Sequence, residues 1–222
     1  MTEEELQTYK DRLRKNLVKY TRKAFRTLPK MTSPCILDIG CGSGVPTMEL
    51  AKLSNGEIVA IDTGQFSLGK LAVKIKKAGL AARVRAENCS MHNMNFPDAS
   101  FDIIWAEGSM NVIGFEKGLK EWRRLLKTGG FLVVHDDLGN FKQKRRQISQ
   151  SGYELINHFM LSYDIWWNEY YAPLDKKFNE VRAKLTGDRR TMALLDDDQR
   201  EIDMFKRDHK RYRSVFLIMR KN

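Results

Sequence analysis

The sequence predicts an α/β fold, namely a doubly wound, mostly parallel sheet of seven strands with an antiparallel last strand and a helical cap inserted between the final two strands. Three observations predict it. From residue 35 to residue 136, short apolar runs alternate with amphipathic stretches of about ten to fifteen residues, which is typical of a parallel sheet with helices on both faces. The runs are continuously apolar, as in strands that are buried on both sides. Two later strand-like runs, 153–163 and 212–222, enclose a helical stretch.

The chain begins with a segment of helical periodicity. Across residues 3–28, apolar residues recur at steps of three and four with lysines and arginines between them, so we expect an amphipathic helix. Pro29 and Pro34 then lie in the segment 27–34. We expect this segment to be a linker, because proline is unsuited to a helix interior or a central strand.

The alternating region supplies five strands and the helices between them. The stretch after the third strand ends at Pro97 and is poorly helical. We expect strands at residues 35–40, 56–62, 83–88, 101–108 and 130–136, and helices at residues 46–54, 67–79 and 115–127.

The C-terminal region departs from this alternation. Residues 153–163 and 212–222 have the composition of strands, and residues 164–211 between them look helical. Asp198 and Glu201 have the spacing of a capping box, which predicts that the last helix begins there and argues against a metal site.

Length and composition are those of a globular chain. The 222 residues suit one α/β domain with an elaboration. The longest apolar run, Val215–Met219, is too short to cross a membrane, and the N-terminal residues lack the apolar heart of a signal peptide. Cys35, Cys41 and Cys89 form no CxxC pair, which argues against a disulfide scaffold or a zinc site. We therefore expect a cytoplasmic protein that has no metal and does not enter the membrane.

The formal net charge of +11 raises the question of a nucleic-acid partner or an anionic membrane surface. The excess is spread along the chain, and its longest cluster is "KQKRR" at 142–146, which a solvated helix face explains equally well. The charge therefore does not decide between a nucleic-acid partner and none.

A glycine-rich turn, "ILDIGCGSGVP" at 36–46, follows the first strand. Glycine removes the side chains, so that backbone N–H groups and the next helix N-terminus can approach a ligand where the strand order reverses. A triphosphate loop would need GxxxxGK[ST], which is absent here. A dinucleotide fingerprint would need a third glycine where Val45 stands.

Two carboxylates flank this turn in the expected fold. Asp38 precedes the glycines, and Asp62 ends the second strand about twenty residues later. An ionised aspartate at that position offers two acceptors to the paired hydroxyls of a ribose. The pattern indicates adenosine without a pyrophosphate.

At these residues the chain resembles the class I S-adenosylmethionine-dependent methyltransferases, in the type 11 small-molecule methyltransferase group. "ILDIGCGSG" resembles the first motif of the family, and "VAID" resembles the acidic end of its second strand. "FPDASFDIIWAEGS" resembles the entry to strand four, and "LKTGGFLVV" the entry to strand five. The four motifs occur in the family's order between residues 36 and 137.

The resemblance implies a Rossmann-like core, S-adenosyl-L-methionine as cofactor and a role for each matching residue. Asp38 and the turn from Gly40 to Gly44 would line the methionine end of the cofactor, and Asp62 would hold the ribose. The positions that usually present an acidic and an apolar residue to the adenine are Ser90 and Met91, so the usual carboxylate is missing. The implied cofactor-binding residues are Asp38, Gly40, Cys41, Gly42, Gly44, Asp62, Ser90, Met91, Glu107 and Tyr20, with Cys41 having no catalytic role.

Two residues at strand ends are candidates for catalysis. Glu107 follows strand four, where the family places residues near the transferable methyl group, although a turn or capping carboxylate is an equal alternative. His135 ends strand five beside Asp136 and Asp137, and a carboxylate there would orient its imidazole. The alternative for His135 is a hydrogen-bonded histidine at the end of a strand.

The resemblance also predicts a division of the chain. We expect residues 1–30 to form an N-terminal lid helix that brings Tyr20 to the cofactor, and residues 31–163 to form the cofactor-binding core. Residues 164–211 would be a helical cap, and residues 212–222 the final strand of the core. The cap has five aromatic residues between Tyr163 and Tyr171. Trp167 and Tyr171, four residues apart on one helix face, are candidates for substrate contact, with core packing as the alternative.

The sequence thus predicts a methyltransferase that acts on a small molecule by in-line transfer. An RNA or protein methyltransferase is the first alternative, although no Asn-Pro-Pro-Tyr type motif follows strand four. A non-catalytic S-adenosylmethionine-binding protein is the second alternative. An NAD-dependent oxidoreductase disagrees with Val45 and with the other motifs. The acceptor atom and the oligomeric state are left open.

Overall fold

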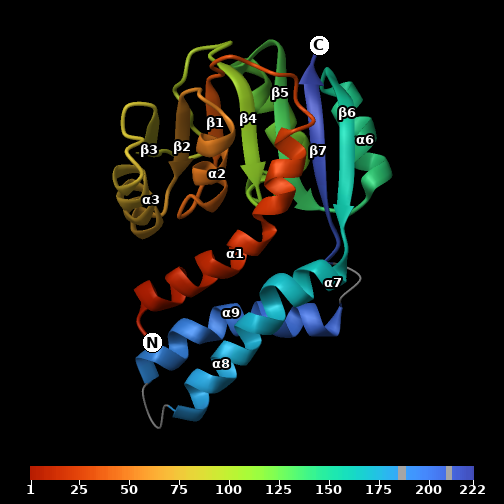
Figure 1. Ribbon diagram of the computed structural model, residues 1–222. Helices are drawn as coiled ribbons and strands as arrows, with labels where there is room; N and C mark the ends of the chain where they lie inside the picture. The colour runs from red at the N-terminus through yellow and green to blue at the C-terminus, as the bar shows by residue number, and fades with distance from the viewer. Residues whose placement is uncertain (185–188, 209–211) are drawn as a thin grey trace. The chain divides into compact units, whose positions relative to one another are not determined.

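The computed structural model describes residues 1–184, 189–208 and 212–222 (Figure 1). The chain divides into two compact units. One unit, here called the helical unit, comprises Met1–Val18 and Leu161–Arg213. The other, the sheet unit, comprises Lys19–Met160 and Ser214–Asn222. Helix α1 (Glu3–Phe25) therefore contributes residues to both.

The described residues form a seven-stranded sheet in the order β3-β2-β1-β4-β5-β7-β6. Strands β1 to β5 are parallel to one another, and β7 runs antiparallel to β5. The predicted fold class is confirmed, including the antiparallel last strand and the helices between β6 and β7. The strands are β1 (Ile36–Ile39), β2 (Ile58–Asp62), β3 (Val84–Asn88), β4 (Phe101–Glu107), β5 (Leu126–Asp137), β6 (Tyr153–Leu161) and β7 (Ser214–Lys221).

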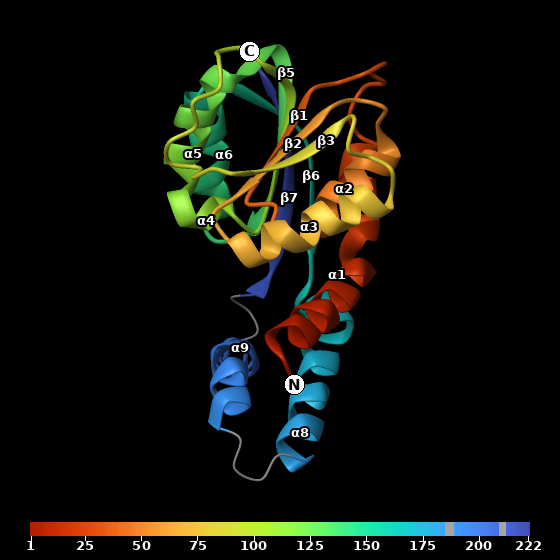
Figure 2. The same cartoon turned by 90° about the vertical axis from the view of Figure 1, so that its left-hand side faces the viewer.

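Helices cover both faces of this sheet, as Figure 2 shows, with α2 and α3 on one side and α4, α5 and α6 on the other. On the α4–α6 side, Leu37, Ile104 and Leu132 of neighbouring strands are fully buried against Trp122. This apolar layer fixes the sheet and so the position of every strand end. The helices are α2 (Val45–Leu53), α3 (Gln65–Lys77), α4 (Met110–Ile113), α5 (Phe115–Trp122) and α6 (Phe141–Gln150).

Two boundaries differ from the prediction. The helix expected to reach residue 127 ends at Trp122 and continues only as a 3-10 turn, Arg123–Leu125. Strand β5 begins earlier than expected because Leu126 already pairs with Phe101 of β4.

In α6, Lys142, Arg145 and Arg146 are exposed while Lys144 is buried. The basic residues at 142–146 thus lie mainly on an exposed helix face, which leaves both interpretations of the cluster open.

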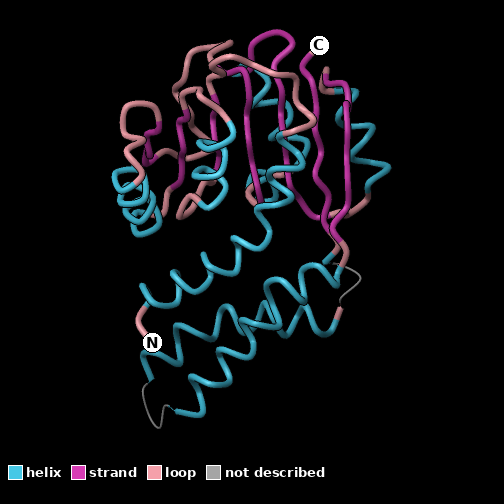
Figure 3. The backbone as a smooth tube through the Cα atoms, in the orientation of Figure 1, coloured by secondary structure: helices cyan, strands magenta, loops and turns pink. Residues whose placement is uncertain are grey.

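The helical unit contains α7 (Tyr163–Trp166), a π-helical turn (Trp167–Tyr171), α8 (Ala172–Lys184) and α9 (Arg189–Arg207), and Figure 3 shows helix along most of its described part. Its core packs Phe178 and Phe205 with Leu6 and Leu13 of α1.

The prediction that a helix begins at Asp198 is wrong, because Asp198 lies inside α9. Its carboxylate lies 2.6 Å from Lys10 Nζ of α1, so the acidic residue forms an ion pair between two helices and caps neither. A capping-box spacing in an acidic run can thus mark either a helix cap or an ion pair between helices, and the sequence pattern alone does not distinguish the two.

Candidate active site

The glycine turn connects β1 to α2 at the carboxyl edge of the parallel strands. Gly40, Gly42 and Gly44 all have positive φ angles, of 72°, 52° and 77°. A Cβ on Gly40 would lie 2.4 Å from Cβ of Ser109, whereas a Cβ on Gly42 would meet no atom within 4 Å. The turn is therefore closed against the protein at Gly40 and open at Gly42, as a ligand-facing backbone requires.

The carboxylate of Asp62 is held against this turn from the end of β2. Its Oδ2 accepts a hydrogen bond from the Gly42 N–H at 2.8 Å, and its Oδ1 accepts one from the Gly64 N–H at 2.8 Å. A carboxylate oxygen has two lone pairs, so each oxygen keeps one for a further donor. This arrangement suits two neighbouring hydroxyl groups of a ribose.

Asp38, in β1, is buried beneath the turn. Its Oδ2 accepts a hydrogen bond of 2.6 Å from the hydroxyl of Thr47. Burial raises the Asp38 pKa to about 7 against the effect of that hydrogen bond, and the negative charge of Asp62 raises it further. Burial, together with the same two carboxylates, raises the pKa of the Cys41 thiol, which argues against thiol chemistry there.

Glu107 ends β4 and is held through a single oxygen. Its Oε1 accepts hydrogen bonds from Trp105 Nε1 and from Thr21 Oγ1, both at 2.8 Å. Burial of the carboxyl group raises the Glu107 pKa to about 7, against the effect of these two bonds, and the charge of Asp38 adds to the rise. A carboxyl group that titrates near neutral pH can take up a proton during catalysis.

His135 lies beside Glu107, since the two residues are paired in the β4–β5 register. Its ring stacks on Phe216 at a centroid distance of 4.2 Å, and its Nε2 lies 2.8 Å from Ser214 Oγ. Burial lowers the His135 pKa to about 3, so the imidazole is neutral at pH 7. The neighbouring carboxylate of Asp136 forms an ion pair of 2.5 Å with Lys144.

The predicted adenine-binding loop lies beside the turn. The backbone N–H of Cys89 donates to the Asp62 carbonyl oxygen at 3.1 Å, which ties the loop to the end of β2. The terminal carbon of Met91 lies 3.7 Å from the position that a Cβ on Gly40 would take. Ser90 Oγ accepts a hydrogen bond from the backbone N–H of His92 at 3.3 Å.

Three predicted site residues have contacts other than those of this cluster. The ring of Tyr20 lies 5.3 Å from the ammonium group of Lys19, and it is the next residue, Thr21, that bonds to Glu107. Trp167 and Tyr171 belong to the helical unit. Trp167 stacks on Phe205, and the buried Tyr171 donates a hydrogen bond of 2.7 Å to Glu201, so both contribute to the core of that unit. Their contact with a substrate stays a prediction.

Four polar or aromatic residues of the site were missed in the sequence. Trp105 is two residues before Glu107 on the same strand face, which is a signal that alternation supplies. Ser109 donates to the Ile39 carbonyl oxygen at 2.6 Å and so closes the turn. Thr21 and Thr47 carry no local signal, because each lies on a helix and acts through its packing against the sheet.

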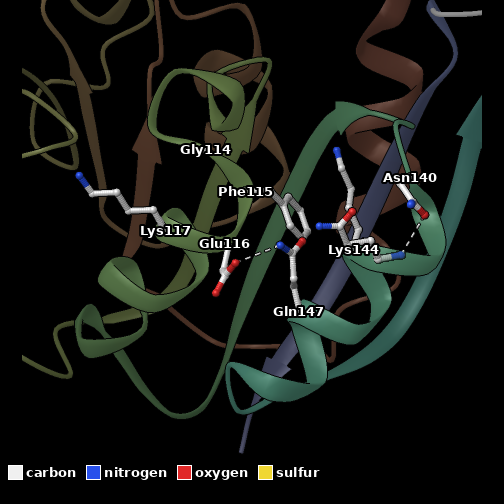
Figure 4. Close-up of a pocket in the computed structure, with 8 residues that line it drawn as sticks. Gly114, Phe115, Glu116, Lys117, Asn140, Lys144 and Gln147 are labelled. Atoms are coloured by element: carbon white, nitrogen blue, oxygen red, sulfur yellow. Dashed lines mark hydrogen bonds between the residues drawn. The ribbon is translucent and has the colours of Figure 1, made fainter.

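A cavity of about 460 Å³ opens between the N-terminal ends of α5 and α6 (Figure 4). Phe115, Glu116, Lys144 and Gln147 are among its lining residues, and Gln147 Nε2 donates to Glu116 at 3.2 Å. None of the predicted site residues lines this cavity. It is therefore separate from the cluster at the glycine turn.

Comparison with known proteins relates part of the chain to methyltransferases. Residues 36–130 match the family model described as "Methyltransferase domain". The chain is 26% identical over 170 residues to sterol 24-C-methyltransferase ERG6B of Gibberella zeae, covering 63% of this chain and 45% of the relative. It is 30% identical over 112 residues to 27-O-demethylrifamycin SV methyltransferase of Amycolatopsis mediterranei, covering 50% of this chain and 41% of the relative. The chain thus spans less than half the length of these curated relatives.

Solved structures share the fold at low sequence identity. A SAM-dependent methyltransferase from Geobacter sulfurreducens in complex with S-adenosyl-L-homocysteine matches with a TM-score of 0.74 and 14% identity, covering 92% of this chain and 91% of the other. The [4+2]-cyclase SpnF matches with a TM-score of 0.73 and 20% identity, covering 91% and 80%.

The fold and the family match place residues 36–130 in an α/β core that has a glycine turn after its first strand. In particular, this segment is similar to methyltransferase domains, which agrees with the resemblance to the class I S-adenosylmethionine-dependent methyltransferases. The match to a methyltransferase domain agrees with S-adenosyl-L-methionine as the expected cofactor.

Proposed function

We propose that this protein is an S-adenosylmethionine-dependent methyltransferase that acts on a small molecule by in-line methyl transfer. One observation carries the proposal. The carboxylate of Asp62 is held against the open glycine turn, and the buried Glu107 at the end of β4 has a pKa that burial, and to a lesser degree the charge of Asp38, raises to about 7. A nucleoside site and a proton-accepting group therefore occur together in the sheet unit.

The residues present fit the cofactor. The spare lone pairs of Asp62 suit the ribose hydroxyls, and the open backbone at Gly42 accommodates a close ligand. We assign the methionine end to Asp38 and to the turn Gly40–Gly44, and the adenine to Ser90 and Met91. Tyr20 is retained as a contact from α1. When bound, S-adenosyl-L-methionine supplies a methyl group on a positively charged sulfur, already activated for attack.

The chain's own task is to bind and orient the acceptor, to exclude water and to receive a proton. Glu107 is the better placed of the two catalytic candidates for proton uptake, since its pKa is raised to about 7. His135 is neutral and bound to Ser214, so we propose that it lines the site beside Glu107. Trp167 and Tyr171 are retained as residues for acceptor choice, on the strength of the aromatic segment 163–171.

The small-molecule acceptor is supported by the names of the relatives, among which are a sterol and a rifamycin methyltransferase. The fold alone leaves a second function open, because the similar SpnF structure is described as a [4+2]-cyclase. A protein that binds S-adenosylmethionine without transferring its methyl group is therefore the alternative. RNA or protein as acceptor is the other alternative, which the net charge of +11 and the basic clusters suggest.

We also propose a cytoplasmic setting. The three cysteines are free, as expected in a reducing compartment. Among the described residues, no helix combines the length and the apolar character needed to cross a membrane.

Calorimetric titration tests the proposal. Wild-type protein should bind S-adenosylmethionine and S-adenosylhomocysteine but not NAD. Asp62→Ala should weaken the binding of both sulfur nucleosides by about ten- to a hundredfold, which is the loss expected when hydrogen bonds to a charged group are removed. Asp197→Ala, at an exposed aspartate of the helical unit, is the control and should bind as wild type does. Wild-type protein that binds neither nucleoside would contradict the proposal.

A further inference from the structure

The hydrogen bonds on Glu107 are unequally divided between its two oxygens. Both donors, Trp105 Nε1 and Thr21 Oγ1, reach Oε1 at 2.8 Å. No hydrogen bond to Oε2 occurs within the described part of the chain. The carboxyl group is thus fixed in orientation through one oxygen, and the other oxygen keeps its lone pairs for a ligand.

The two donors come from different parts of the sheet unit. Trp105 is two residues before Glu107 in β4, whereas Thr21 is 86 residues away in α1. Thr21 is 1% exposed, so its hydroxyl is shielded from water and its bond to the carboxyl group is not in competition with solvent. One helical turn further, Phe25 packs against Trp105 at a ring distance of 6.3 Å. Thr21 and Phe25 therefore hold the Trp105–Glu107 pair from α1.

The charged and titratable groups around Glu107 do not stabilise its negative charge. Hydrogen bonds are therefore the main stabiliser of its ionised form. From β1, the carboxyl group of Asp38 repels a negative charge on Glu107. From β5, His135 is neutral. On α1, the guanidinium group of Arg22 binds Glu49, and the ammonium group of Lys23 lies 4.2 Å from the ring of Phe159. Losing one hydrogen bond should therefore change the proton affinity of Glu107 measurably.

We propose that Thr21 is a positioning residue that, with the indole of Trp105, holds Glu107 by Oε1 and leaves Oε2 to take a proton from the methyl acceptor. This inference rests on the proposed methyltransferase function. The acceptor's lone pair forms the bond to the methyl carbon while the carbon–sulfur bond breaks with its electrons on sulfur. The acceptor's proton passes from its oxygen or nitrogen to Oε2. The arrangement suits an alcohol, a phenol or a neutral amine that carries an N–H, because each has a lone pair for the methyl carbon and a proton to give. An acceptor that is already anionic has no proton to give and is repelled by Asp38 and Glu107.

The first test is the titration of Glu107 in the whole protein without ligand. Side-chain carboxyl ¹³C signals of labelled glutamate are followed with pH, and Glu107→Gln assigns the signal. Thr21→Val keeps the shape of the side chain but removes the hydroxyl, so the Glu107 pKa should rise by about one unit. Thr21→Ser keeps the hydroxyl and should restore the wild-type value. Thr27→Val, which removes a hydroxyl bonded to the Ala24 carbonyl oxygen, is the matched control and should change nothing.

Trp105→Phe removes the other donor and provides a second variant, with a rise in the same direction. An unchanged Glu107 pKa in both Thr21→Val and Trp105→Phe would overturn the inference. The second test is S-adenosylmethionine binding by calorimetry, which should be alike in wild type and Thr21→Val. If wild-type protein does not bind, the proposed function fails while the titration of Glu107 still decides the role of Thr21. Once an acceptor is found, the acid limb of the rate profile should move up by the same shift in Thr21→Val.

Discussion

Burial of Asp38 makes the stability of the sheet unit depend on pH. The folded form keeps its proton up to a pKa of about 7, whereas the unfolded chain loses it near 3.8. Between these values the native state binds more protons than the unfolded state, so this residue lowers stability as pH rises, by up to about 1.4 kcal/mol per pH unit. Asp38→Asn removes the titration and can still accept the Thr47 bond. We expect it to gain on the order of 2 kcal/mol over wild type between pH 5 and pH 7.

Urea unfolding of both proteins at the two pH values measures this difference. The other titrating groups, among them Glu107 and His135, are common to both proteins and largely cancel. Asp98→Asn, at an aspartate whose side chain is 76% exposed, controls for the loss of a carboxylate. A difference between Asp38→Asn and wild type that is the same at pH 5 and pH 7 would show that Asp38 is not held protonated by the fold.

The residues of the site that could be predicted are those whose role is set by their own segment. Asp38 was predicted because it lies just before the glycines in the first strand, and Asp62 because it ends the second strand. Thr21 acts on Glu107 across 86 residues, and Ser214 on His135 across 79. Such contacts depend on how a helix or a late strand packs on the sheet, for which the sequence around Thr21 or Ser214 has no pattern.

The glycine turn is the element on which the site depends, and its glycines differ in what they require. In Gly42→Ala the new methyl group meets no atom within 4 Å. The only cost is that alanine must adopt the left-handed backbone conformation, which is about 1–2 kcal/mol. Gly40→Ala adds a contact of 2.4 Å with Ser109, for a total of about 3 kcal/mol. The free energy of unfolding, from chemical denaturation, checks the order. Equal losses for the two variants would mean that the turn can move away from Ser109.

Tyr171 belongs to the element that the sequence left between two interpretations. Its hydroxyl is bound to Glu201 at 2.7 Å, and its ring packs against Phe205 at 4.2 Å. Tyr171→Phe keeps the ring and removes the hydrogen bond, so we expect the helical unit to lose about 1 kcal/mol. Urea unfolding followed by the fluorescence of Trp166 and Trp167 measures it. If the urea midpoint of Tyr171→Phe equals that of wild type, the Tyr171 hydroxyl does not stabilise the core of the helical unit.

At the level of elements, apolar continuity predicted the strands well because both faces of the sheet are covered, which leaves long uninterrupted runs such as "FLVV" in β5. The ends of elements were harder to predict. Asp198 had the spacing of a helix cap but forms an ion pair with Lys10 instead. Leu126 had the periodicity of a helix but pairs with Phe101 of β4 in the sheet. In both positions a tertiary partner decides between two local structures of similar merit.

At the scale of the whole molecule, the tryptophans report on the two units separately. Trp105 and Trp122 are fully buried in the sheet unit, and Trp166 and Trp167 lie in the helical unit. The variant Trp166→Phe/Trp167→Phe therefore gives a fluorescence signal from the sheet unit alone. The contacts expected to hold the cofactor from the turn and from β2 lie in that unit, so cofactor binding should raise the thermal transition that this variant reports.

The size of the effect follows from linkage. A ligand at about a hundred times its dissociation constant stabilises the native state by about 2.7 kcal/mol. For a chain of this size each kcal/mol corresponds to about 2–4 °C, so the transition should rise by about 5–10 °C with S-adenosylhomocysteine. Asp62→Ala in the same background should lose most of this rise at the same ligand concentration, because the ribose contacts are gone. If the transition temperature of Asp62→Ala still rises with S-adenosylhomocysteine, the nucleoside is not held at the end of β2, and the proposed cofactor site at the glycine turn is wrong.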